Sequence, residues 1–175
     1  VCMALAIYIT QRAAYCERIL VRGIKLALTI SKSGNPNHPY WNPVKEEVVA
    51  LMRSGISMNR HYRKLTPMAA DEMASWGDWK NALWIWESVL ESRPNVVAVI
   101  ANISRAYLEG GNLPLAEKYL ERAQRLQPTA PAVRSLNVML LERTGQYHLA
   151  ASEIKALFRD DVVDYDLVYA GYLVG

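Results

Sequence analysis

The sequence predicts an all-α protein, a helix–turn–helix solenoid preceded by an N-terminal apolar and basic helix. Three observations lead to this fold class. From residue 63 onward, glycine, alanine and large apolar residues recur with a spacing of 34. Prolines that cannot continue a helix separate the copies. The first 30 residues hold an apolar run followed by basic residues at helical spacing.

The composition is that of an ordinary globular protein. Of the 175 residues, 51% are hydrophobic and 21% are charged, which excludes a disordered chain. Two cysteines, Cys2 and Cys16, are too few for a disulfide scaffold. If both lie on one helix, a rise of about 1.5 Å per residue holds them roughly 21 Å apart, too far for a bridge.

The net charge of +3 conceals an asymmetry. Residues 1–64 carry ten Lys and Arg against three Asp and Glu, whereas residues 65–175 carry ten against fourteen. The two parts are therefore expected to have different surroundings, and the acidic second part argues against nucleic acid as the main partner.

Residues 1–9 are apolar but shorter than the roughly 20 residues that span a bilayer. They are interpreted either as the end of a transmembrane helix or as the start of a buried helix. Because the chain starts at Val1 and its last element stops at Gly175, we expect it to be part of a longer protein.

Residues 10–30 are predicted to continue this helix, with basic side chains on one side. That side could face lipid phosphates at a membrane surface, so that residues 1–30 contact a membrane. Alternatively, the apolar side packs against the following domain. The basic residues are Arg18, Arg22, Lys25 and Lys32.

Residues 31–62 are rich in proline and asparagine and are predicted to be an irregular connection. Within it, Asn42 and Pro43 are a plausible cap and first turn for a short helix over residues 43–53.

The repeat has a physical explanation. Each glycine allows the chain to leave a first helix in the left-handed conformation. An alanine four residues before a large residue allows two helices to approach closely, and the proline ends the second helix. The residues in register are Gly77, Gly111 and Gly145; Ala82, Ala116 and Ala150; Trp86, Leu120 and Ile154; and Pro94 and Pro128.

This pattern resembles the tetratricopeptide repeat, with copies at 63–96, 97–130 and 131–164, so that 63–164 holds three tetratricopeptide-like repeats. Residues 165–175 are then the start of a fourth repeat or a capping helix. Such repeats stack into a solenoid whose first helices line a groove. The candidate groove residues, whose alternative role is that of ordinary solvated or packed helix residues, are Asp71, Ala98, Asn102, Arg105, Ser135 and Met139.

The sequence contains no Gly-rich phosphate loop, no paired metal ligands and no nucleophile motif. We therefore predict no catalytic residue, no metal site and no cofactor in this chain. One basic cluster could contact an anionic lipid, a pyrophosphate-linked glycan or nucleic acid, or could simply be a solvated lead-in to the first repeat. It consists of Arg53, Arg60, His61, Arg63 and Lys64.

Particular stretches add a finer resemblance. They are Asn37-His38-Pro39-Tyr40-Trp41, His61-Tyr62-Arg63-Lys64, Trp76-Gly77-Asp78-Trp79 and Pro131-Ala132-Val133-Arg134-Ser135-Leu136. The chain is similar to the C-terminal tail of bacterial O-antigen ligase/polymerase-like membrane proteins, a group that includes the pilin-type protein O-oligosaccharyltransferases.

This resemblance implies an inner-membrane protein that transfers a glycan from a lipid-pyrophosphate carrier. Its catalytic residues would lie outside this chain. The repeats would be a non-catalytic periplasmic tail that holds a protein or glycan acceptor or another partner. Basic residues beside an apolar run favour the cytoplasmic side of a membrane, which is opposite to this periplasmic placement. The residues concerned are Arg12, Arg18, Arg22 and Lys25.

Two other functions are considered. The chain could be a tetratricopeptide-repeat adaptor or scaffold that binds a protein partner and has no enzymatic role. An enzyme is the weakest interpretation, because nothing in the sequence pairs a nucleophile with a base.

Overall fold

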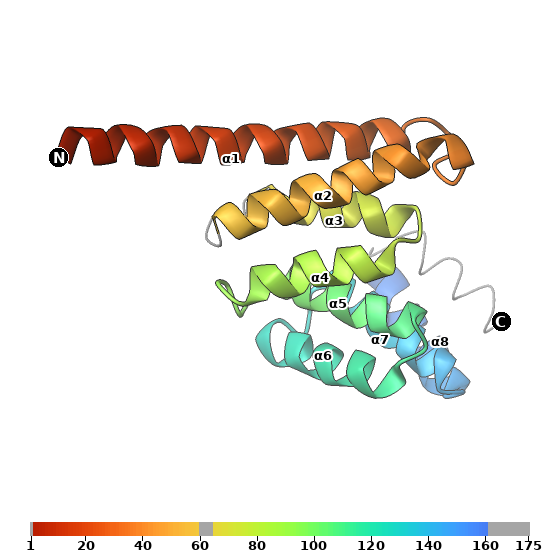
Figure 1. Cartoon of the computed structure of the whole chain (residues 1–175). Coiled ribbons are helices and arrows are strands. Elements are labelled where there is room, and N and C mark those ends of the chain that lie inside the picture. Colours follow the sequence, from red (N-terminus) through yellow and green to blue (C-terminus); the bar gives the residue numbers. More distant parts are fainter. Residues whose placement is uncertain (1, 60–64, 161–175) are drawn as a thin grey trace. The chain divides into compact units, whose positions relative to one another are not determined.

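The structure, a computed structural model, describes residues 2–59 and 65–160. The chain divides into two units, Val1–Pro94 and Asn95–Gly175, and each is built from helices joined by short connections (Figure 1). Unit 1 contains α1 (Cys2–Ser31), the 3₁₀ turn η1 (Pro39–Trp41), α2 (Asn42–Met58), α3 (Thr66–Ser75) and α4 (Trp79–Leu90). Unit 2 contains α5 (Val97–Glu109), α6 (Leu113–Leu126), α7 (Pro131–Arg143) and α8 (Tyr147–Arg159). The predicted all-α helix–turn–helix fold is confirmed.

Three turns that join paired helices share one geometry. Gly77, Gly111 and Gly145 have φ angles of 87°, 74° and 76°, in the left-handed region that glycine adopts without steric cost. In the turn after α5, the Asn112 N–H donates to the carbonyl of Tyr107 at 2.8 Å, which satisfies a carbonyl at the helix end. The side chain of Asn112 also accepts a hydrogen bond from the N–H of Leu115, and this caps α6.

The paired helices meet where an alanine faces the partner helix. Ala116 and Leu120 are both buried on α6, one turn apart on the same side of the helix. The hydroxyl of Ser104 on α5 donates to the carbonyl of Ala116 at 2.6 Å, so α5 and α6 are in contact at the alanine. The corresponding alanine and large residue are buried in α4 and α8 as well: Ala82 and Trp86, and Ala150 and Ile154.

α1 and α2 form a further close pair in unit 1. The thiol of Cys16, which is buried and free, lies 3.3 Å from the carbonyl oxygen of Gly55. Burial raises the pKa of this thiol, so it stays protonated. Along the same contact, Val48, Met52 and Ile56 recur every fourth residue and bury one side of α2.

This pairing differs from what the sequence predicts for residues 31–62. Instead of a short helix over 43–53, α2 has 17 residues. The apolar stripe of α2 stabilises the extra turns, because it packs on α1. The second half of α1 also packs against α3, so its apolar side covers the following domain, as one of the two interpretations expected. Residues 60–64 and 161–175 lie outside the described part of the chain, and with them the end of the third repeat and the predicted fourth repeat or cap.

Two glycines at the α1–α2 contact give a testable contrast. A Cβ at position 55 would lie 2.4 Å from Cδ2 and 2.8 Å from Cγ of the buried Leu20, whereas a Cβ at position 23 would come within 3 Å only of the mobile end of Met52. We expect Gly55→Ala to destabilise the protein by about 1–3 kcal/mol through overpacking. Gly23→Ala should be close to neutral, because Met52 can turn aside and alanine favours the helix by about 1 kcal/mol. Thermal unfolding followed by circular dichroism compares the two, and equal shifts in Tm would contradict the packing described.

Candidate functional site

A shallow pocket lies in unit 2, between the first helices of two consecutive helix pairs. It has a volume of about 90 Å³, which is the size of one amino-acid side chain. Its lining comes from α5 and α7 and comprises Ala101, Asn102, Arg105, Ala132, Ser135, Leu136 and Met139. Four of the residues predicted to line a groove, Asn102, Arg105, Ser135 and Met139, are thus brought together here.

Other contacts of unit 2 hold α5 and α7 beside each other. The side-chain amide of Gln124 on α6 donates to the side chain of Asn137 on α7 at 3.3 Å. At the C-terminal ends of α5 and α7, the carboxylate of Glu109 lies 3.7 Å from the guanidinium of Arg143. The pocket therefore lies on elements that are tied together outside it.

Arg134 fixes α7 to α8. Its Nε donates to Glu153 at 2.8 Å, and its Nη1 donates to Asp160, just beyond the end of α8, at 2.6 Å. The hydrogen bonds to Asp160 and Glu153 raise the pKa of the Arg134 guanidinium above its ordinary value, so this group stays charged. These bonds hold α7, which carries part of the pocket lining, against α8.

The lining combines two kinds of chemistry. Asn102, Arg105 and Ser135 are polar or charged, and each of them already has an interaction within the protein. Leu136 and Met139 add apolar side chains to the lining, with Leu136 almost fully buried, and Ala132 is a small exposed residue of the same helix. Such a surface can bind the backbone of an extended peptide and accommodate one of its side chains.

Two of the predicted groove residues lie elsewhere. Asp71 is on α3 in unit 1, where its carboxylate accepts a hydrogen bond at 3.2 Å from the indole N–H of the buried Trp86. Asp71 is therefore tied to a core side chain of its own helix pair. Ala98 lies in the first turn of α5 and does not line the pocket.

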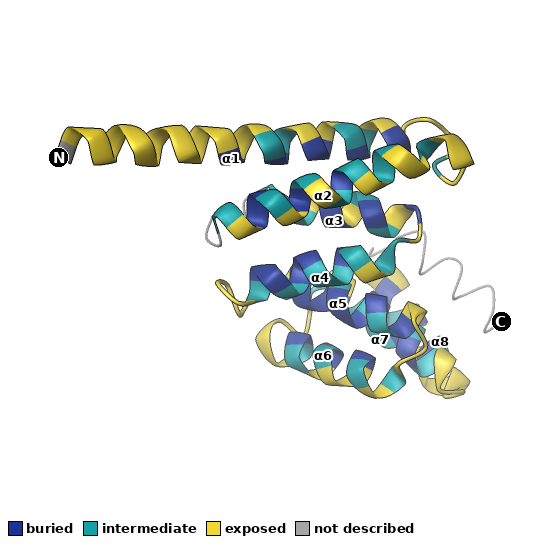
Figure 2. Ribbon diagram, viewed as in Figure 1, coloured by how far each residue is buried: buried dark blue, intermediate teal, exposed yellow. Residues whose placement is uncertain are grey.

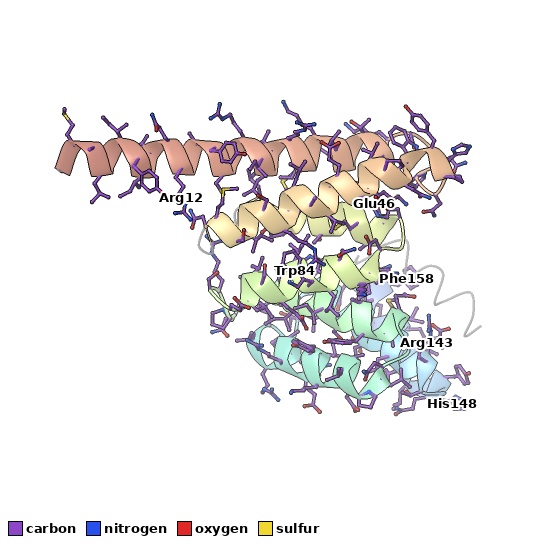
Figure 3. The ribbon with its side chains drawn as sticks, in the orientation of Figure 1. Arg12, Glu46, Trp84, Arg143, His148 and Phe158 are labelled. Carbon is purple, nitrogen blue, oxygen red and sulfur yellow. The ribbon has the colours of Figure 1, made fainter. Side chains whose placement is uncertain are left out.

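Of the predicted basic cluster, only Arg53 is described. Its guanidinium lies 4.9 Å from the centre of the Trp84 ring on α4, and it donates to the side chain of Asn81 at 3.4 Å. Arg53 thus has partners within unit 1 (Trp84 is labelled in Figure 3). The other members, Arg60, His61, Arg63 and Lys64, lie outside the described residues.

A second pocket, which the sequence did not predict, lies between α2 and the start of α4. It has a volume of about 340 Å³. Its charges are balanced, with Lys45 and Arg53 against Glu46 and Asp78, and so favour no sign of ligand. Lys45 lies 5.2 Å above the Trp76 ring, so both cations of this second pocket already face an aromatic ring. The full lining is Lys45, Glu46, Val49, Ala50, Arg53, Asp78 and Asn81.

Residues 2–59 and 65–160 contain neither a membrane-spanning helix nor a metal-binding cluster. None of the helices there has both the length and the hydropathy needed to cross a bilayer. The same residues contain no cluster of three or more His, Cys, Asp or Glu side chains that could hold a metal ion.

Comparison with known proteins identifies the fold. No protein-family model and no curated protein sequence matches the chain. Among solved structures, a tetratricopeptide repeat protein from Parabacteroides merdae ATCC 43184 matches with a TM-score of 0.63 and 14% identity, over 95% of this chain and 70% of that one. YrrB, described as a TPR protein with an unusual peptide-binding site, matches with a TM-score of 0.55 and 18% identity, over 85% and 81%. The MamA RS-1 ArsTM double mutant matches with a TM-score of 0.52 and 17% identity, over 76% and 72%. The chain therefore has a tetratricopeptide-like fold.

The ion pairs of Arg134 predict a measurable contribution to stability. Replacing Arg134 with Met keeps most of its apolar stem but removes the donors that face Glu153 and Asp160. We expect a loss of roughly 1 kcal/mol in the free energy of unfolding, mainly from the pair with Glu153, because the side chains of Arg134 and Glu153 are only 19% and 29% exposed whereas Asp160 is exposed. Arg125→Met is the matched control, since Arg125 forms a long, exposed pair with Glu121 and should change stability little. Urea unfolding measures both, and an equal loss in the two variants would refute the assigned role of Arg134.

Proposed function

We propose that this chain is a protein-interaction repeat module that binds an extended segment of a partner protein in the pocket of unit 2. The observation that carries the proposal is the convergence of Asn102, Arg105, Ser135 and Met139 on one pocket. These residues come from two first helices, and their side chains combine polar and apolar contacts in the way that peptide recognition requires.

Two further facts support a peptide ligand. The pocket has room for one side chain, which fits a short segment rather than a large flat surface. A protein with a similar fold, YrrB, is described as having a peptide-binding site.

A second candidate is the finer function implied by the sequence resemblance. In this proposal the chain is the non-catalytic periplasmic tail of an inner-membrane glycan ligase, glycan polymerase or O-oligosaccharyltransferase. The tail would hold a protein or glycan acceptor while glycan is transferred from a lipid-pyrophosphate carrier. The specific observation in its favour is the exposed apolar start of α1, where Met3, Leu5, Ile7 and Ile9 are all solvent-exposed. The adaptor function without an enzymatic parent is equally consistent with the fold.

A substitution in the pocket tests the peptide-binding proposal. Peptides selected from a random display library on the immobilised full chain serve as the probe. Ala132→Glu fills the pocket with a charged side chain, and we expect it to weaken binding of the selected peptides by about tenfold or more. Ala132 is exposed, so the change should leave the fold intact.

Leu149→Glu is the matched control for this experiment. Leu149 is an exposed residue of α8 that does not line the pocket, so this variant should bind like the wild type. Isothermal titration calorimetry compares the three proteins. Equal affinity of the Ala132→Glu variant, or a library that yields no binder, would overturn the proposal.

The reading frame upstream of Val1 separates the two candidates. The membrane-tail proposal expects about ten hydrophobic spans of roughly 20 residues there, with one long polar loop before the last pair. Sequencing the coding region decides the matter. Further 34-residue repeats, or a single anchor, would reject the ligase parent and leave the adaptor.

A further inference from the structure

The first half of α1 is not packed against the protein. Residues 3–15 are exposed, and the next residue, Cys16, is buried (Figure 2). From there to Ile30, the side of α1 that carries Leu20 and Ala27 packs against α2 and α3. One continuous helix therefore has a packed half and a projecting half.

The end of the projecting half is apolar around its whole circumference. Residues 3–9 are seven consecutive apolar residues, and at 100° per residue they face every direction. Met3 is 78% exposed, and Leu5, Ile7 and Ile9 are 51–57% exposed. A protein groove covers only one face of a helix, whereas lipid can surround a helix on all sides. The shape of this segment therefore fits a bilayer better than a groove.

The residues that follow suit the boundary between lipid and water. Tyr8 and Tyr15 are exposed and have an apolar ring with a polar tip, the kind of side chain that is enriched at membrane interfaces. The guanidinium of Arg12 donates to the hydroxyl of Tyr8 at 3.3 Å, so a positive charge lies one turn beyond the apolar segment (Arg12 is labelled in Figure 3).

Further positive charge lies on the outward face of the packed half. Arg18, Arg22 and Lys25 are exposed there, and Glu17 is the one acidic residue among the described residues that line this face. Arg22 also forms an ion pair with Glu47 of α2 at 2.5 Å. With Arg18, Arg22 and Lys25 counted against Glu17 and Glu47, this face keeps a net charge of +1, the sign that a membrane with anionic lipids attracts.

The distances along the helix agree with this partner. A helix that lies in the membrane interface buries its apolar side chains roughly 5–10 Å into the acyl boundary, which is enough to cover the side chains of residues 3–9. Arg18 and Lys25 follow Ile9 by about 13 Å and 24 Å along the helix, beyond the Debye length of about 8–10 Å, so they reach the phosphates when α1 lies along the membrane surface. Because α1 is fixed to α2 at Gly23 and Gly55, its apolar end and its basic face act together.

We infer that α1 binds the surface of an anionic phospholipid bilayer, with residues 3–9 inserted and Arg12, Arg18 and Lys25 facing the lipid phosphates. This inference depends on α1 alone. It does not require the unit 2 pocket or the glycan-transfer parent, so it can fail while the peptide-binding proposal stands.

Vesicle flotation with the full chain tests the inference. We expect the protein to float with vesicles of phosphatidylcholine and phosphatidylglycerol, and to float much less with phosphatidylcholine alone. Leu5→Asp combined with Ile7→Asp should abolish flotation, because charged side chains resist insertion. Arg18→Gln combined with Lys25→Gln should weaken binding to the anionic vesicles by about 30-fold, from roughly 1 kcal/mol per charge.

All four of these positions are exposed, so circular dichroism melts of the variants should match that of the wild type. Leu149→Asp on α8 is the matched control for the apolar change, and it should float like the wild type. Absence of flotation with anionic vesicles, or unchanged flotation of the Leu5→Asp and Ile7→Asp protein, would overturn the inference. Equal flotation on both vesicle types would overturn the anionic recognition. A stable dimer that does not float would show that a second copy, and not lipid, covers this end of α1.

Discussion

Paired helices in this chain pack closely where one of them carries a residue with a very small side chain. Ala82, Ala116 and Ala150 are buried in the second helices of their pairs, and a large residue follows one turn later. A larger residue at the alanine would push the two axes apart. The small alanine therefore allows the two helices of each pair to run close together. The tight glycine turns, the helix caps and the buried contacts of each pair all depend on that close packing.

The α1–α2 pair satisfies the same constraint with different residues. Gly55 has no side chain where Leu20 packs, and the thiol of Cys16 reaches the Gly55 carbonyl. The physical solution is the one used in the repeats, but the residue types differ: Val48 and Met52 stand 34 residues before Ala82 and Trp86, and Pro43 stands 34 residues before the turn glycine Gly77. A search for period therefore detects the later pairs and overlooks this one. The length of α2 could not be predicted for the same reason. Its buried residues Val48, Met52 and Ile56 stabilise the helix only because they pack on α1, and the sequence pattern does not show that contact.

The candidate site could be predicted in part. Asn102, Arg105, Ser135 and Met139 were found from sequence because side chains one turn apart share a helix face, and because the register of the repeat places corresponding faces of α5 and α7 next to each other. Asp71 could not be placed this way. Its hydrogen bond to Trp86 depends on the relative orientation of α3 and α4, which cannot be read from the spacing of residues in the sequence. The same is true of Arg53, whose ring partner Trp84 lies on another helix.

α1 shows why burial has to be considered along a helix as well as around it. A helix that serves only as core has one apolar face, and its second half fits that description, with Leu20 and Ala27 inward and Arg18 and Lys25 outward. Its first half carries apolar side chains in all directions, and α2 and α3 leave these side chains exposed. A helix that is apolar all round is buried either in the core of a large protein or in a membrane, and the described residues provide no such core around residues 3–9. We therefore expect residues 3–9 to contact a partner outside this chain. Because α1 is packed rigidly on α2, that contact also determines how the rest of unit 1 faces the partner.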